Sequence, residues 1–295
     1  MPWQQLTLTC NGLQADEAEL ALNELSALAI TLRDAQDQPL LEPQPGEMPL
    51  WSAIRITGLF DQAVNLVSIR EQLVEKLNWL DAGSIQSETL GDQQWERTWL
   101  QYFKPIDCGN RLWICPSHCQ PIEKDAVNII LDPGLAFGTG THPTTKLCLQ
   151  WLAQQNLQGK TIIDYGCGSG ILAIAALKLG AKKAICIDND PQALIATRDN
   201  AQRNSIPVHD IETILASKAY MGDQKADVVL ANIIASILIQ LVPAINTLVK
   251  PHGTLVLSGI LETQIDDVQQ AYLPYIKFDT AKFEQQWVMM AGSRK

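Results

Sequence analysis

Residues 161–177 read TIIDYGCGSGILAIAAL, and the rest of the architecture can be built outward from them. Five largely apolar residues favour a buried strand, three glycines at every second position favour a tight turn, and the apolar residues after them continue as a helix. Strands that alternate with helices form parallel sheets, whose ligands bind outside the carboxyl ends of the strands. This stretch therefore predicts a strand and a ligand-binding turn of an α/β sheet.

The same alternation continues on both sides of this stretch. Strands are expected at 161–165, 184–188, 208–214, 226–231 and 253–258, and helices at 143–155, 170–179, 191–203, 233–247 and 261–272. Two further strands, 275–283 and 287–293, have only a short connection between them, so they should pair antiparallel. The pattern predicts a doubly wound α/β sheet whose last strand is antiparallel.

The first ninety residues follow another order. Strands at 3–10, 29–33, 51–57 and 84–90 surround a helix at 14–29 and a second helix that Asp61 can cap. This β-α-β-β-α-β order is ferredoxin-like, which makes the proline-rich stretch 39–49 an internal loop. We expect an acidic ferredoxin-like domain over 1–90, a connecting helix over 91–104 and the larger domain over 105–295.

Charge separates the two ends of the chain. Residues 1–110 hold 16 acidic and 6 basic side chains, whereas residues 111–295 hold 16 of each, so the whole net charge of −10 lies in the first third. Such a segment repels nucleic-acid phosphates and attracts a basic partner, although acidity can also serve solubility alone. We expect no direct nucleic-acid binding.

Composition also predicts a compartment. No window of about 18 uncharged apolar residues and no secretory signal is visible, which argues against a membrane protein. Seven cysteines without a framework of pairs are typical of reduced thiols in the cytoplasm. Cys115 and Cys119 have metal-ligand spacing but no second ligand pair nearby, so we expect no metal.

The glycine turn carries the first chemical signal. Asp164 precedes Gly166, Gly168 and Gly170 in the pattern D-x-G-x-G-x-G, which differs from the dinucleotide pattern G-x-G-x-x-G. An acid at this place suits a cationic ammonium and opposes a phosphate. Asp188 ends the next strand, where a carboxylate can accept hydrogen bonds from both hydroxyls of a ribose or can simply lie in a turn.

Two further places hold candidate site residues. Asn232 closes an apolar strand, where its amide can cap the next helix or face the ligand cleft. The segment 132–145, DPGLAFGTGTHPTT, is rich in glycine and small hydroxyl residues around Phe137, as expected of a loop that covers a ligand. Pro143 suits the first position of a helix, which makes His142 its N-cap rather than a base and puts Thr145 in its first turn.

Four motifs carry a family resemblance: DPGLAFGTGTHPTT, IDYGCGSG, CIDNDPQAL and ANIIASIL, in this order. Together with the length and the acidic N-terminal module, they resemble the bacterial PrmA-type methyltransferases of large-subunit ribosomal protein L-eleven. The resemblance implies a class I S-adenosylmethionine-dependent methyltransferase fold. It implies that Thr145, Gly166, Asp188 and Asn232 contact S-adenosylmethionine and that Phe137 lines the methyl-transfer site.

The resemblance also implies the reaction. Methyl groups pass to lysine side chains and an N-terminal amine of a basic ribosomal protein, which the N-terminal domain recognises while the connecting helix lets that domain move. Related amino-methyltransferases carry Asn-Pro-Pro-Tyr where this chain has Asn232-Ile233-Ile234-Ala235, so a stacking aromatic at that place is in doubt.

The residues suggest roles within that reaction. Asn232 is the candidate catalytic residue, because its amide could accept a hydrogen bond from the attacking amine. Asp164 is expected to hold the methionine ammonium, with Gly168 in the turn beside it. Three alternatives stay open: an RNA methyltransferase, an NAD-dependent dehydrogenase and a non-catalytic sensor of an adenosine ligand.

Overall fold

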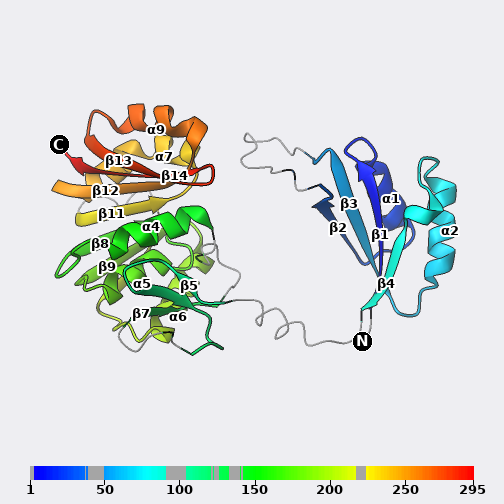
Figure 1. Cartoon of the computed structure of the whole chain (residues 1–295), viewed down its shortest axis with the longest axis horizontal. Helices are drawn as coiled ribbons and strands as arrows, with labels where there is room; N and C mark the ends of the chain where they lie inside the picture. Colours follow the sequence, from blue (N-terminus) through cyan, green and yellow to red (C-terminus); the bar gives the residue numbers. More distant parts are fainter. Residues whose placement is uncertain are drawn as a thin grey trace. The chain divides into compact units, whose positions relative to one another are not determined.

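The chain forms two compact units, residues 1–98 and 99–295 (Figure 1). The computed structural model describes residues 3–36, 38, 50–90, 104–120, 122, 126–132, 140, 142–216 and 224–295. The expected proline-rich loop 39–49 and all but the last residue of the expected connecting helix 91–104 lie outside the described residues.

The first unit is a four-stranded antiparallel sheet with two helices. Its elements are β1 (Trp3–Asn11), α1 (Ala15–Glu24), β2 (Ala29–Asp34), β3 (Ala53–Asp61), α2 (Leu66–Lys76), the short 3-10 turn η1 (Ala82–Ser84) and β4 (Gln86–Leu90). The strand order is β2-β3-β1-β4, so the chain pairs β1 with two strands that come later. This arrangement confirms the predicted ferredoxin-like fold.

The core of this unit follows the period of two that strands impose. Leu6 and Leu8 on β1 and Ile54 and Ile56 on β3 are all buried, and they pack with Leu22 of α1. Residues between them on each strand are more exposed, as expected where one face of a sheet is covered by helices.

Two details of the first unit differ from expectation. The helix expected over 14–29 ends at Glu24, because Ser26 has a φ of 66°, outside the helical range. The predicted cap Asp61 is wrong: Asp61 ends β3 and accepts from the Ala63 N–H, whereas Asn65 caps α2. Several polar residues lie between the end of β3 and the start of α2. The path of the backbone between these elements determines which of their side chains reaches the free N–H groups at the start of α2.

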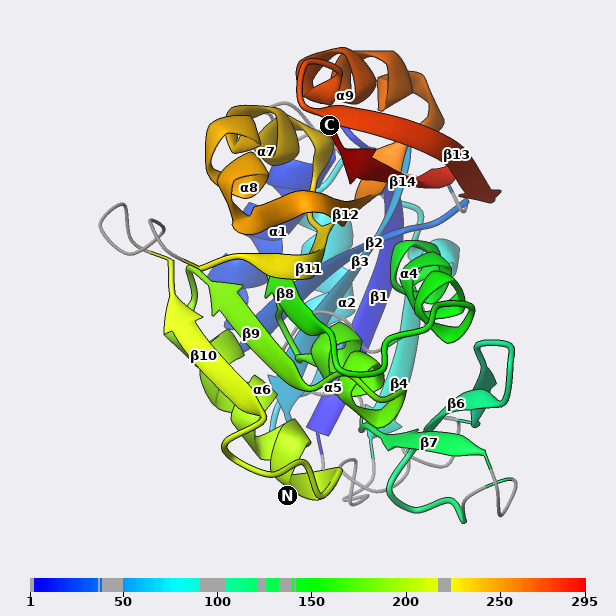
Figure 2. The same cartoon turned by 90° about the vertical axis from the view of Figure 1, so that its left-hand side faces the viewer.

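The second unit is built on a seven-stranded sheet of order β10-β9-β8-β11-β12-β14-β13 (Figure 2). Its strands are β8 (Thr161–Tyr165), β9 (Lys183–Asp188), β10 (Ile211–Leu215), β11 (Ala226–Asn232), β12 (Val249–Leu261), β13 (Ile276–Glu284) and β14 (Trp287–Arg294). The neighbours from β10 to β12 pair parallel, whereas β14 lies antiparallel between β12 and β13. The predicted doubly wound sheet with an antiparallel last strand is confirmed.

Helices cover both faces of this sheet. One apolar core joins the sheet to α4 (Pro143–Ala153), α5 (Ile171–Lys178) and α6 (Pro191–Arg203). A second core joins it to α7 (Ala235–Gln240), α8 (Val242–Leu248) and α9 (Ile265–Tyr272), which follows the 3-10 turn η3 (Glu262–Gln264). The single helix expected over 233–247 is thus two helices, and Pro243 lies at the start of the second.

A small three-stranded sheet precedes α4. It contains β5 (Ile106–Asp107), β6 (Leu112–Cys115) and β7 (Val127–Ile130), in the order β5-β6-β7. Ile114 and Ile129 carry its buried side chains into the core shared with α4 and α5. Within the described part of the chain, no helix has the length and apolar character that crossing a membrane requires.

Candidate functional site

The glycine turn connects β8 to α5. Gly166, Gly168 and Gly170 have φ angles of 75°, 53° and 78°, a region that side chains with a Cβ atom disfavour. The Ile187 carbonyl accepts hydrogen bonds from the N–H groups of Gly166 at 2.7 Å and Cys167 at 3.1 Å. The turn is therefore tied to the end of β9, the neighbouring strand.

Asp188 lies beside this turn at the last position of β9. Its Oδ2 atom accepts from the Gly168 N–H at 2.9 Å and its Oδ1 atom from the Asp190 N–H at 3.0 Å. Each carboxylate oxygen can accept a second hydrogen bond, so these contacts do not exhaust its capacity for a ligand hydroxyl. The structure thus joins Asp188 at the end of β9 to Gly168 in the turn after β8.

Asp164 is the buried acid of the site, with 1% of its surface exposed. Its Oδ2 atom accepts from the Ala173 N–H at 3.2 Å, in the first turn of α5, where N–H groups lack partners within the helix. Burial raises the pKa of Asp164 to about 7, against the lowering effect of this hydrogen bond. The charge of Asp188 raises the pKa further.

Asn232, the last residue of β11, contacts Thr145 of α4. Its Nδ2 atom donates to the Thr145 hydroxyl at 3.2 Å, and Thr145 lies in the first turn of α4 with 1% exposure. An amide that donates through Nδ2 keeps Oδ1 as an acceptor. The alternative role of Asn232 as a helix cap is wrong, because Ile234 occupies the N-cap position of α7.

Gly259 lies against Ile233, the residue after Asn232, although no prediction named it. It has a φ of 83°, and a Cβ atom there would lie 2.4 Å from the Ile233 carbonyl oxygen. On the other side, a Cβ atom on Gly166 would lie 2.3 Å from Cγ2 of Ile233. Both glycines thus make room for the turn that begins with Ile233, directly after Asn232. A lone glycine within the apolar run of β12 is the signal that could have identified it.

His142 caps α4 as predicted. Its Nδ1 atom accepts from the Thr144 N–H at 3.4 Å and lies 2.8 Å from the Thr144 hydroxyl. Its ring makes an edge contact with Trp287 at 4.8 Å between centroids. Burial lowers the pKa of His142, so the imidazole is neutral at pH 7.

These contacts gather the predicted residues at one edge of the sheet. Gly166, Gly168 and Asp188 are linked at the ends of β8 and β9, and Asn232 and Thr145 at the end of β11, which pairs with β8. Parallel strands end at the same edge, which is why residues so far apart in the chain meet. Phe137 lies outside the described residues.

The electrostatics of this edge favour a cation. The charge that acts on Asp164 is that of another carboxylate, Asp188. Asp164, the acid that precedes the glycine turn, would repel a pyrophosphate at that turn. A sulfonium or ammonium group fits this pair of carboxylates, and a ribose fits the open acceptor capacity of Asp188. Among the described residues, no group of three or more His, Cys, Asp or Glu side chains is arranged to hold a metal ion.

The chain is similar over its whole length to a family of known proteins. A family model described as "Ribosomal protein L11 methyltransferase (PrmA)" matches residues 2–295. The ribosomal protein L11 methyltransferase of Teredinibacter turnerae is 47% identical over 295 residues, which cover 100% of this chain and 98% of that protein. The one of Photorhabdus laumondii is 49% identical and covers 99% of this chain and 98% of its own length.

A solved structure is also similar. The ribosomal protein L11 methylase from Lactobacillus delbrueckii subsp. bulgaricus superposes with a TM-score of 0.60 at 36% sequence identity. The match covers 65% of this chain and 100% of that chain. The similarity in sequence therefore extends over both units, and the similarity in structure extends over about two thirds of the residues.

Proposed function

This chain belongs to the PrmA family of ribosomal protein L11 methyltransferases, and on that premise we propose that it transfers methyl groups from S-adenosylmethionine to amines of ribosomal protein L11. The acceptors in this proposal are lysine side chains and the N-terminal amine. The observation that carries it is the convergence of an acidic glycine turn, Asp188 and Asn232 at one edge of a parallel sheet.

Each site residue has a proposed role in binding the cofactor. The backbone of Gly166 and Gly168 lies against it, Asp188 accepts hydrogen bonds from its ribose, and Thr145 contacts it beside Asn232. The buried carboxylate of Asp164 supplies negative charge for the methionine ammonium. Phe137 lines the methyl-transfer site in this proposal, as the family resemblance implies.

The bound cofactor supplies an electrophilic methyl group on a positively charged sulfur. The lone pair of a substrate nitrogen would form the new N–C bond as the S–C bond breaks with its electron pair going to sulfur, S-adenosylhomocysteine would leave, and the proton released by the nitrogen would pass to solvent water. The amine must be neutral to attack, and a lysine near pKa ~10.4 becomes easier to deprotonate when buried beside a cation. The Asn232 amide oxygen orients the amine by accepting its hydrogen bond.

The acidic N-terminal region, residues 1–90, is proposed to recognise the substrate, with residues 91–104 as the connection to the catalytic region 105–295. Proteins that bind RNA are commonly basic, so an acidic surface is complementary to a ribosomal protein. We also propose the cytoplasm as the compartment, because no disulfide joins the described cysteines.

Transfer of a radiolabelled methyl group from S-adenosylmethionine to purified ribosomal protein L11 tests this function. We expect label in the protein, with methylated lysine and a methylated terminal amine in its hydrolysate. The variant Asp188→Ala, which removes the ribose acceptor, should raise the KM for the cofactor. Absence of label with the wild-type enzyme would refute the proposal.

The same assay distinguishes the alternatives. Ribosomal RNA without protein should acquire no label and should not be retained with the enzyme on a filter, in contrast to the behaviour of an RNA methyltransferase. Titration with NADH should give no saturable binding, because Asp164, the acid that precedes the glycine turn, opposes a pyrophosphate. Label in RNA, or tight binding of NADH, would favour the competing function.

A further inference from the structure

Helix α6 presents buried polar side chains toward the glycine turn. Thr197, Asn200 and Asn204 have exposed fractions of 0%, 8% and 5%, and their spacing places them on one face of the helix and its C-cap. A helix that only packed on a sheet would bury apolar side chains there, because buried polar groups are costly unless they are hydrogen-bonded. Their contacts therefore need an explanation.

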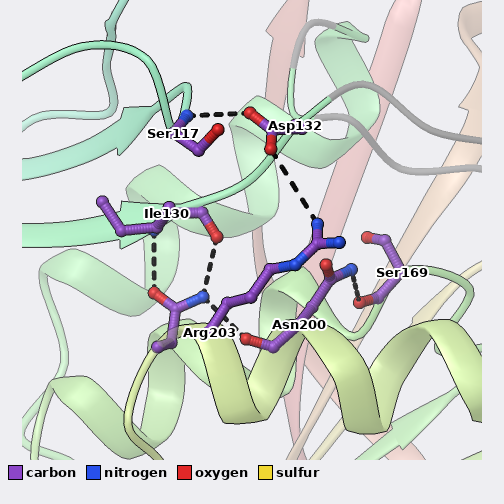
Figure 3. Close-up of polar contacts among 7 residues, drawn as sticks. Ser117, Ile130, Asp132, Ser169, Asn200 and Arg203 are labelled. Atoms are coloured by element: carbon purple, nitrogen blue, oxygen red, sulfur yellow. Dashed lines mark hydrogen bonds and ion pairs between the residues drawn. The ribbon is translucent and has the colours of Figure 1, made fainter.

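Two of these side chains hold carbonyl oxygens of the turn. The Thr197 hydroxyl donates to the Gly168 carbonyl at 3.0 Å. Nδ2 of Asn200 donates to the Ser169 carbonyl at 2.9 Å (Figure 3). A carbonyl oxygen only accepts, so the NH₂ group of Asn200 must face Ser169.

The peptide units of the turn are thus held from both sides. Asp188 binds the Gly168 N–H, whereas α6 binds the carbonyls of Gly168 and Ser169. Glycine lets a peptide plane rotate easily, so a turn with this sequence has several orientations of similar energy. The contacts from α6 select one of them.

Asn204 anchors the end of the same helix. Its Nδ2 atom donates to the Ile130 carbonyl and its Oδ1 atom accepts from the Ile130 N–H, both at 2.8 Å, as a neighbouring strand would do. Nη1 of Arg203 lies 3.9 Å from Oδ2 of Asp132 (Figure 3). The Oδ1 atom of the same carboxylate accepts a hydrogen bond from the Ser117 N–H. These contacts bind the C-terminal end of α6 to the small sheet. They therefore restrict the position of the helix that carries Asn200.

We propose that Asn200 is a positioning residue for the cofactor. Asn200 acts through the Ser169 carbonyl and, together with Thr197, sets the orientation of the glycine turn. This inference rests on the proposed function, because it assigns the turn to S-adenosylmethionine. It concerns affinity for the cofactor and leaves recognition of the protein substrate unchanged.

The test is Asn200→Leu, which keeps the number and branching of the side-chain non-hydrogen atoms and removes the donor. We expect the Kd for S-adenosylmethionine, measured by calorimetry, to rise about tenfold, because the Ser169 carbonyl loses the hydrogen bond from Asn200 and the turn reorients. The KM for ribosomal protein L11 at saturating cofactor should stay within about twofold. Thr197→Val, which replaces the hydroxyl by a methyl group, should also raise the Kd for S-adenosylmethionine. This second variant tests the proposal if Asn200→Leu does not fold.

A matched control separates positioning from stability. Ala201→Gly weakens the same helix at a buried site by about 1 kcal/mol without touching the turn, so it should lower the Tm and leave the Kd unchanged. If Asn200→Leu and Thr197→Val bind the cofactor as tightly as the wild type, the inference is wrong. If the wild-type enzyme itself binds no S-adenosylmethionine, the proposed function fails instead.

Discussion

At the scale of single residues, the site depends on side chains whose surroundings change their ordinary chemistry. Asp164 is a carboxylic acid that burial keeps protonated to about pH 7, and Asn232 is an amide that one hydroxyl partner orients. Neither property belongs to the residue type, since both come from neighbours on other elements. Two predictions follow from these neighbours.

Asn232→Ala should lower kcat about 100-fold, because a misplaced amine loses the advantage of an aligned attack. The Kd for S-adenosylmethionine should change much less, since Asp188 and the glycine turn remain. Single-turnover methyl transfer and calorimetry measure the two effects separately. Thr145→Ser, which keeps the hydroxyl that accepts from Asn232, is the matched control. An Asn232→Ala enzyme with normal turnover would exclude the orienting role.

Binding of S-adenosylmethionine should strengthen as the pH rises through the pKa of Asp164, which is about 7. Below this pH the carboxyl group is neutral and offers the ammonium no charge, whereas above it the carboxylate is present. Between pH 5.5 and pH 7 the Kd should fall about tenfold, while a ligand amine of pKa ~7.7–8.0 stays charged. Calorimetry at each pH measures this slope.

Asp164→Asn provides the comparison for this pH dependence. The variant cannot ionise at this position, so its affinity should be weak at pH 7 and nearly independent of pH. A wild-type affinity as flat as that of the variant would show that Asp164 does not pair with the ammonium.

At the scale of elements, the turn after β11 exists because neighbouring strands leave space for it. Ile233 fits between Gly166, which follows β8, and Gly259 of β12. The register of β12 against β14 also shifts between Leu257 and Ile260, which marks a local irregularity around Gly259. The position of Asn232 is therefore a property of three adjacent strands.

Gly259→Ala should destabilise the protein and lower kcat. The positive φ costs about 1–2 kcal/mol for a residue with a Cβ atom, and contact with the Ile233 carbonyl adds about 1–3 kcal/mol unless the turn moves. Urea unfolding and the rate of methyl transfer measure these effects.

Gly159→Ala is the matched control, since Gly159 has a φ of 73° and nothing within 4 Å of an added Cβ atom. It should lose stability through strain alone and keep its kcat. Equal effects of the two variants on kcat would mean that the contact with Ile233 has no bearing on Asn232.

At the scale of the whole molecule, charge is distributed unevenly. The excess of negative charge lies in residues 1–110, whereas residues 111–295 are neutral on balance. Charge complementarity of this kind mainly affects association rate and specificity, and salt screens it beyond about 8–10 Å at physiological ionic strength. Recognition of a basic protein and binding of the cofactor should therefore respond differently to salt.

Binding of ribosomal protein L11 should weaken several-fold when the salt concentration rises from about 50 to about 300 mM, because the Debye length shortens over this range and the opposite charges are screened. Surface-plasmon resonance can measure the change. Binding of S-adenosylmethionine to the same enzyme is the internal control and should change little, because Asp164 is buried. If the affinity for ribosomal protein L11 does not change with salt concentration over this range, the acidic region does not contribute to recognition through its charge.

The features that depend on local pattern were predictable from the order of residues along the chain. Periodicity located the elements of both units, glycine spacing located the turn at 166–170, and Pro143 predicted His142 as the cap of α4. These signals are readable because each arises from residues within a few positions of one another.

The contacts between residues far apart in the chain became visible in the folded structure alone. It placed β14 between β12 and β13, joined Asn232 to Thr145, brought Gly259 against Ile233 and turned Thr197 and Asn200 toward the glycine turn. It also chose Asn65 rather than Asp61 as the cap of α2. The physical reason is that these contacts depend on strand order, register and the close packing of the interior, which a pattern along the chain does not contain.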